Sequence, residues 1–218
     1  MDILLSLVDF IVHLDHHIAD LIEAYGAWTY GILFAIVFIE TGVVVLPFLP
    51  GDSLLFVAGA FAARGQFSLA TLIGLLALAA ILGNTSNYWI GRNIGPKVFQ
   101  WEDSRFFNRA AFNKTHAFYE KHGAVTIIVT RFLPFMRTFS PFVAGVAAMT
   151  HTRFQFYNMV GGLLWVVSLC LAGYWFGNIG WIKNNLTLVI VALIVIPGLP
   201  TLIVAGREWW AARARRAV

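Results

Sequence analysis

Four charged residues lie inside segments that are otherwise apolar and interrupted by proline. Two are the acids Glu40 and Asp52, in ETGVVVLPFLPGDSLLFVAG. The other two are Arg131 and Arg137, in RFLPFMRTFSPFVAG. A guanidinium group grips phosphate oxygens through two parallel hydrogen bonds, which lysine does not reproduce. The sequence therefore predicts that the arginines bind a lipid phosphate and that the carboxylates compete for them. A proton held by one acid would couple lipid movement to the proton gradient.

A purely structural interpretation of these four residues stays open. A charge in the middle of a membrane costs at least about 2.5–3.5 kcal/mol on insertion scales. Opposite charges offset part of that cost when they pair. The four residues would then form two buried salt bridges that only fix how the two segments dock. Replacing each arginine by lysine distinguishes the two interpretations.

The composition indicates a membrane protein. Of the 218 residues, 59% are hydrophobic and 12% are charged, whereas soluble proteins have about a quarter charged residues. The mean hydropathy is +0.76. Four apolar runs approach the ~20 residues that a helix needs to cross the hydrocarbon. They are 28–49, 67–91, 156–176 and 186–206. We therefore expect an all-α polytopic membrane protein.

Two copies of one sequence unit recur along the chain. FVAG occurs at 56–59 and 142–145, and YW occurs at 88–89 and 174–175, both at an offset of 86 residues. Matches at a fixed offset indicate internal duplication. Because an odd number of crossings separates the copies, we expect an inverted repeat with the site at the interface of its units.

Proline and glycine mark where each copy is broken. The first copy contains Pro47, Pro50 and Gly51, and the second contains Pro134 and Pro141. Proline removes a backbone donor and clashes with the preceding helical turn. Each limb is mostly too short to span the bilayer alone. We therefore expect two re-entrant broken-helix hairpins, each followed by a transmembrane helix.

The whole chain is expected to form a single membrane domain. Its N-terminal stretch has apolar residues at a spacing of three to four, which predicts an amphipathic helix at the interface. The expected order is an interfacial helix 1–26, hairpin 28–63, transmembrane helix 67–91, amphipathic loop 92–122, hairpin 123–149, transmembrane helices 156–176 and 186–206, and a basic tail 207–218.

The distribution of charge predicts the orientation and the partners. The net charge is +4, and basic residues cluster in 92–122 and 207–218. The positive-inside rule places both segments, and hence the C-terminus, on the cytoplasmic side. The balance favours anionic lipid headgroups over nucleic acid. We expect no cofactor and no metal, because the histidines of HLDHH lack further ligands. The sequence leaves the oligomeric state open, a homodimer included.

Polar residues on the span after the first hairpin have two interpretations. Asn84, Asn87 and Tyr88 lie in GNTSNYWIG, with the two asparagines on one helix face. They would line the path of a headgroup, or they would pack helices against one another through small and amide side chains.

The quoted segments resemble those of the DedA family of bacterial inner-membrane proteins, which is related to eukaryotic VTT-domain lipid scramblases. The resemblance extends to GNTSNYWIGRNIG, FYEKHG and GYWFG and covers nearly the whole chain. It implies transport of a lipid such as undecaprenyl phosphate or phosphatidylethanolamine in the cytoplasmic membrane, with support of envelope integrity and the proton motive force.

The resemblance also implies roles for individual residues. The family's essential acids correspond to Glu40 and Asp52, and its essential arginines to Arg131 and Arg137. Relatives often carry Gly-Asp where this chain has Gly83-Asn84. If that aspartate carries a proton in relatives, coupling here depends on other acids.

Two other function classes are weaker alternatives. A proton or cation antiporter would use the buried acids, but two arginines in the same site oppose a bare cation path. A lipid phosphatase would use arginines and histidines, but the sequence shows no Ser–His–Asp order and no metal-ligand spacing. We therefore expect a transporter and not an enzyme.

Overall fold

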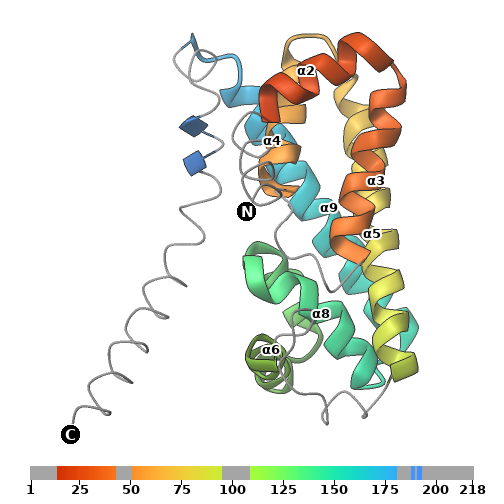
Figure 1. Ribbon diagram of the computed structural model, residues 1–218. Helices are drawn as coiled ribbons and strands as arrows, with labels where there is room; N and C mark the ends of the chain where they lie inside the picture. Colours follow the sequence, from red (N-terminus) through yellow and green to blue (C-terminus); the bar gives the residue numbers. More distant parts are fainter. Residues whose placement is uncertain (1–13, 43–50, 95–108, 181–187, 190, 193–218) are drawn as a thin grey trace, which may run out of the picture.

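Most of the residues that the structure describes are helical, and none of them lies in a strand. The computed structural model describes residues 14–42, 51–94, 109–180, 188–189 and 191–192. Upright helices form an elongated bundle, and shorter helices cross its two ends (Figure 1). The predicted all-α class is confirmed.

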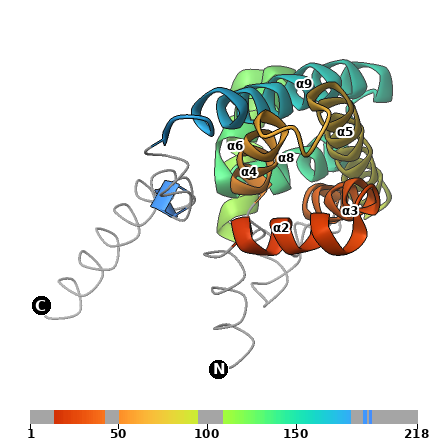
Figure 2. The ribbon, with the colours of Figure 1, turned by 90° about the horizontal axis from the view of Figure 1, so that it is seen from above.

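Four upright helices build the bundle. They are α3 (Trp28–Gly42), α4 (Gly51–Ala63), α5 (Leu69–Ile94) and α9 (His151–Phe176). Helix α4 packs on α9, α3 packs on α5, and α5 also packs on α9. Seen along the bundle, the four helices lie around a shared core (Figure 2).

Helices α5 and α9 are long and apolar enough to cross a membrane. Each has 26 residues, which corresponds to about 39 Å of helix. Only 39% and 33% of their most apolar windows are buried inside the molecule. Large apolar side chains are therefore left on the outside, among them Leu78, Leu82, Met159, Leu163 and Leu164. A hydrocarbon environment accounts for such faces, since a soluble protein rarely exposes so large an apolar area.

Helices α3 and α4 are too short to span a bilayer alone. They have 15 and 13 residues, against the roughly 20 that are needed. The segment between them, which contains Pro47 and Pro50, lies outside the described residues. The same holds for residues 1–13, residues 95–108, the tail 207–218, and all but four residues of the predicted span 186–206.

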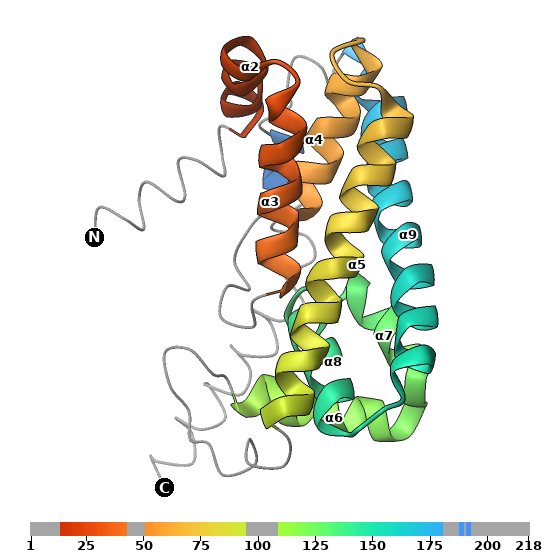
Figure 3. The ribbon, with the colours of Figure 1, turned by 90° about the vertical axis from the view of Figure 1, so that its right-hand side faces the viewer.

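Two short helices lie across the ends of the bundle. Helix α2 (Leu14–Tyr25) crosses the end near the start of α3 (Figure 2), with Ile18 buried against the core. Helix α6 (Arg109–His122) crosses the opposite end (Figure 3). Helix α2 lies within the segment 1–26 and helix α6 within the segment 92–122, and the amphipathic, interfacial character expected of both segments stays a prediction.

The second proline-containing segment is a chain of short helical pieces. After α6 come η2 (Gly123–Val125), α7 (Thr126–Val129) and η3 (Thr130–Phe132), and then α8 (Pro134–Val146). Leu133 between η3 and α8 is extended, with φ −113° and ψ 105°. A proline disfavours helical backbone in the residue before it, so Pro134 both ends η3 and starts α8.

The expected break at Pro141 was wrong. Helix α8 continues through this proline to Val146. A proline inside a helix costs about 3 kcal/mol and removes one hydrogen bond, but it does not forbid the helix. The packing of α8 on α5 and α6 offsets that cost.

Glycines of the repeated motifs lie where helices approach most closely. At the α4–α9 crossing, a Cβ added at Gly59 would collide with the Cys170 carbonyl, and one at Gly173 would collide with the Phe56 carbonyl. At the α5–α8 crossing, a Cβ added at Gly145 would collide with the Tyr88 carbonyl, and one added at Gly91 would collide with the Phe142 carbonyl. The two FVAG motifs thus make matching contacts, each with the long helix of the other copy.

The hydrophobic core has an upper and a lower part. The larger cluster joins α2, α3, α4, α5 and α9 and includes Leu33, Leu55, Leu76 and Val166. A second cluster at the α6–α8 end includes Tyr88, Ile127 and Phe154. Between these two parts, the end of α3 meets the start of α4 and the start of α8 (Figures 1 and 3). The polar site lies at this junction.

Candidate polar site

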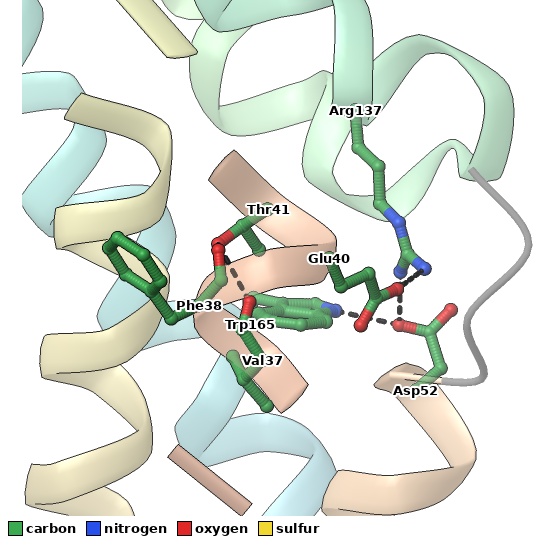
Figure 4. Close-up of polar contacts among 7 residues, drawn as sticks. All are labelled: Val37, Phe38, Glu40, Thr41, Asp52, Arg137 and Trp165. Carbon is green, nitrogen blue, oxygen red and sulfur yellow. Dashed lines mark hydrogen bonds and ion pairs between the residues drawn. The ribbon is translucent and has the colours of Figure 1, made fainter. Parts of the chain in front are cut away.

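One arginine holds both acids. Arg137 lies in the first turn of α8, and its Nη2 is 2.5 Å from Glu40 Oε1 at the end of α3. Its Nη1 is 2.7 Å from Asp52 Oδ1 in the first turn of α4. Figure 4 shows the guanidinium between the two carboxylates. Of the three side chains only Glu40 is fully buried, whereas Arg137 and Asp52 are 13% and 28% exposed. The arginine pairs with two charges that hydrocarbon would otherwise leave unpaired.

Trp165 and Gly51 complete this ion-pair cluster. The indole N–H of Trp165, on α9, donates to Asp52 Oδ1 at 2.9 Å (Figure 4), and Arg137 lies over the ring at 5.5 Å from its centroid. A Cβ at Gly51 would collide with the Glu40 carboxylate. The glycine therefore allows the start of α4 to approach the acid closely.

Arg131 has no acidic partner within the described residues. Its side chain is 5% exposed, and its Nη2 donates to Asn158 Oδ1 at 2.6 Å. The guanidinium also lies 6.0 Å from the centroid of the Trp165 ring, and Nε has no hydrogen-bond partner in the described part of the chain. The structural alternative had the four residues form two salt bridges. Arg137 makes both of those seen here, and Arg131 is left with neutral contacts within the described residues.

The two arginines open onto one pocket. It is lined by Glu40, Thr41, Asn84, Arg131, Arg137, Thr138 and Trp165. Two positive charges and one negative charge therefore line one space at the junction of the two cores, and the second acid, Asp52, is bound to Arg137 at its edge. In a low-dielectric setting, the charges of Arg137 and of the two acids that contact it interact far more strongly than they would in water.

Asn84, Asn87 and Tyr88, on α5, have different places in the structure. Asn84 lines the pocket. Asn87 instead donates to the Thr138 carbonyl at 2.8 Å and to the Thr41 carbonyl at 3.3 Å. It thereby fastens α5 to α8 and to the end of α3. Asn87 acts in helix packing, which is one of the two roles weighed for it.

Tyr88 anchors the turn between α8 and α9. Its hydroxyl donates to the Met149 carbonyl and accepts from Arg92 Nη1 at 2.9 Å. Its ring stacks on Phe154 with centroids 4.3 Å apart. The side chain is fully buried, and it does not line the pocket.

We expect Tyr88→Phe to lower stability without changing transport. The change keeps the ring but removes the hydroxyl, so the Met149 carbonyl keeps only the hydrogen bond from Arg92 Nη1, 3.0 Å away. The loss of one hydrogen bond costs about 0.5–1.5 kcal/mol. The melting temperature of the purified protein in detergent should fall by several degrees. Transport measured well below that temperature should match the wild type, and a loss of transport there would instead assign Tyr88 to the lipid path.

Two contact residues of the site were not singled out by the sequence. Trp165 and Asn158 lie in the apolar run 156–176. A buried asparagine and tryptophan in a membrane span are signals in themselves, because their polar atoms need partners there. Their partners could not be inferred from spacing, since Asn158 is 27 residues from Arg131 and Trp165 is 113 residues from Asp52.

A metal site finds no support in the described residues. Within the described ranges, no group of three or more histidine, cysteine or acidic side chains lies together. His13 falls outside these ranges.

Comparison with known proteins finds a matching family model and similar sequences. A family model described as the VTT domain matches residues 49–175. The chain is 51% identical over 205 residues to Protein DedA of Escherichia coli (strain K12), covering 93% of this chain and 94% of that protein. No solved structure matches the chain significantly.

More distant relatives carry membrane names. An uncharacterized membrane protein of Mycobacterium tuberculosis (strain ATCC 25618 / H37Rv) is 44% identical over 188 residues, which cover 85% of this chain and 81% of that protein. The inner membrane protein YghB of Escherichia coli (strain K12) is 34% identical over 194 residues, with coverage of 87% and 83%. The apolar helices, the matched domain and these relatives together show that the chain is a membrane protein of the DedA family of VTT-domain proteins.

Proposed function

We propose that this protein moves a phosphate-bearing lipid, such as undecaprenyl phosphate or phosphatidylethanolamine, across a bacterial cytoplasmic membrane. The observation that carries the proposal is the unequal state of the two arginines. Arg137 is engaged by two carboxylates, whereas Arg131 is buried beside the same pocket with neutral partners only. A buried cation without a counterion is costly, and a phosphate entering the pocket would supply one.

Competition for Arg137 provides a route to coupling. A phosphate that reaches Arg131 also comes within range of Arg137, whose two arms are held by Glu40 and Asp52. If the phosphate takes one arm, a carboxylate loses its partner in a buried setting. That acid is then stabilised by taking up a proton. Glu40 suits this role, because it is 3% exposed and its Oε2 makes no hydrogen bond within the described residues.

The proposed transport path follows the inverted repeat. Helices α3 and α4 form the limbs of one re-entrant hairpin, and the pieces from η2 to α8 form the other. The matching contacts of the two FVAG motifs support this assignment. The loop 92–122 and the C-terminus lie in the cytoplasm in this scheme, and the pocket lies where the hairpins meet.

The two alternative functions are less well supported. A cation antiporter needs acids that are open to cations, and here one guanidinium engages both. A phosphatase needs a nucleophile or a metal at the pocket. The described lining of the pocket includes two threonines, but it has no cysteine, and no histidine that could activate a threonine.

Replacing Arg131 by lysine tests the proposal most cleanly. Arg131 makes no ion pair within the described residues, so this change leaves no acid unpaired. Lysine keeps the charge but loses the two-armed grip on phosphate. In proteoliposomes with labelled undecaprenyl phosphate or phosphatidylethanolamine, we expect transport to fall at least about tenfold, which corresponds to 1.4 kcal/mol, while the melting temperature changes little.

The same assay defines the mode of transport. Acceleration by a pH gradient that is lost in Glu40→Ala would establish proton coupling, and transport indifferent to the gradient would mean a scramblase. Release of inorganic phosphate from the labelled lipid would favour the phosphatase. Full transport by a folded Arg131→Lys variant would remove the phosphate role of this arginine.

A further inference from the structure

We infer that Asn158 is a positioning residue that holds Arg131 ready for an anion while leaving its charge uncompensated. This inference rests on the proposed function and deepens it, because it assigns to one amide the preference of the pocket for an anionic group. Asn158 is fully buried on α9. The sequence did not predict a role for it.

The orientation of the amide is fixed by its surroundings. Asn158 Oδ1 accepts from Arg131 Nη2 at 2.6 Å, and its Nδ2 donates to the Ile81 carbonyl at 3.0 Å. A guanidinium only donates and a carbonyl only accepts. The reversed amide would therefore set donor against donor and acceptor against acceptor, so only the observed orientation fits.

A polar network on α5 and α9 supports the amide. Asn158 Nδ2 also lies 3.1 Å from Gln155 Oε1 and 3.3 Å from Thr85 Oγ1, and Gln155 Nε2 donates to Thr85 Oγ1 at 2.8 Å. The Asn158 side chain is thus bonded on both sides of its amide. Arg131, whose own segment is a chain of short helical pieces, takes its direction from this fixed point.

The chemistry of the amide matters as much as its position. An amide oxygen accepts a hydrogen bond from one N–H of the guanidinium and leaves its positive charge in place. A carboxylate would accept the hydrogen bond and also neutralise the charge. The same guanidinium lies beside the pocket with Nε unbonded within the described residues. A neutral partner therefore keeps Arg131 oriented and leaves its attraction for a phosphate intact.

The test compares Asn158→Asp with the wild type. It measures binding of farnesyl phosphate to the purified full-length chain in an uncharged detergent, by calorimetry, with farnesol as the probe without phosphate. The aspartate places a counterion beside Arg131, so we expect farnesyl phosphate to bind at least tenfold more weakly. Asn158→Ala, which leaves Arg131 without this acceptor, should bind about three- to tenfold more weakly. Farnesol binding should not change in either variant.

Two controls separate positioning from a structural effect. Asn178→Asp makes the same replacement at an exposed position just after α9 and should bind like the wild type. In an Arg131→Ala background, Asn158→Ala should not weaken binding further, because the amide acts through that arginine. A structural role would give losses that add to the loss caused by Arg131→Ala.

Each result bears on one claim. Wild-type affinity in folded Asn158→Asp, with binding weakened in Arg131→Ala, would overturn the inference and keep the proposed function. Equal affinity of the wild type for farnesyl phosphate and farnesol would overturn the proposed function and the inference with it. If Asn158→Asp does not fold, Asn158→Ala decides: affinity within twofold of the wild type overturns the inference.

Discussion

Arg137→Met is expected to destabilise the protein severely. The change leaves Glu40 and Asp52 without the guanidinium that lies 2.5 and 2.7 Å from them. Removing one partner of a buried ion pair costs about 3–5 kcal/mol. For a chain of this length, each 1 kcal/mol lowers the melting temperature by about 2–4 °C. We therefore expect a fall of roughly 10 °C in detergent.

Neutralising the acids should reverse that loss. In Glu40→Gln/Asp52→Asn/Arg137→Met no buried charge is left unpaired, so most of the melting temperature should return. Transport should not return, because the arginine and the acids are all absent. Arg153→Met, at an exposed position on α9, serves as the matched control and should behave like the wild type.

This comparison separates the two interpretations of the charged cluster. Recovery of both stability and transport in the triple variant would show that the charges only fix helix docking. Recovery of stability alone supports a role in transport. A normal melting temperature in Arg137→Met by itself would contradict the pairing described here.

Gly173→Leu is expected to prevent folding. A Cβ at Gly173 would already collide with the Phe56 carbonyl and lie 2.8 Å from the Phe56 carbonyl carbon. A leucine adds three further carbons between two backbones in contact. Overpacking a core costs about 1–3 kcal/mol for a few extra methylenes, and more where the neighbour cannot yield. Here the neighbour is the backbone of α4, so the two helices must separate.

Separation of α4 and α9 would also disrupt the site. Asp52 lies at the start of α4, and its partner Trp165 lies on α9. We expect no monodisperse folded protein in size-exclusion chromatography. Gly74→Leu is the matched control, because nothing lies within 4 Å of a Cβ at Gly74 on α5, and it should fold normally. A folded Gly173→Leu with transport intact would show that the α4–α9 crossing is looser than described.

Local features of the sequence determined the class of the protein and the location of its polar segments. The long apolar runs predicted membrane helices, and the described parts of those runs are helical apart from residues 67–68. The charges in apolar surroundings identified Glu40, Arg131 and Arg137, which line the pocket, and Asp52, which binds Arg137. The break before Pro134 was also predictable, because a proline restricts the residue preceding it wherever it occurs.

The tertiary structure alone decided how these residues pair. Arg137 reaches acids 97 and 85 residues away along the chain, and Arg131 meets an asparagine on another helix. Helical periodicity specifies which residues share a face of one helix, but not which helix ends meet. Helix α8 likewise continues through Pro141, because its packing outweighs a local cost. The ion pairs and hydrogen bonds between helices depend on close helix crossings at glycines. The distances between helices at these crossings are set only when the chain folds.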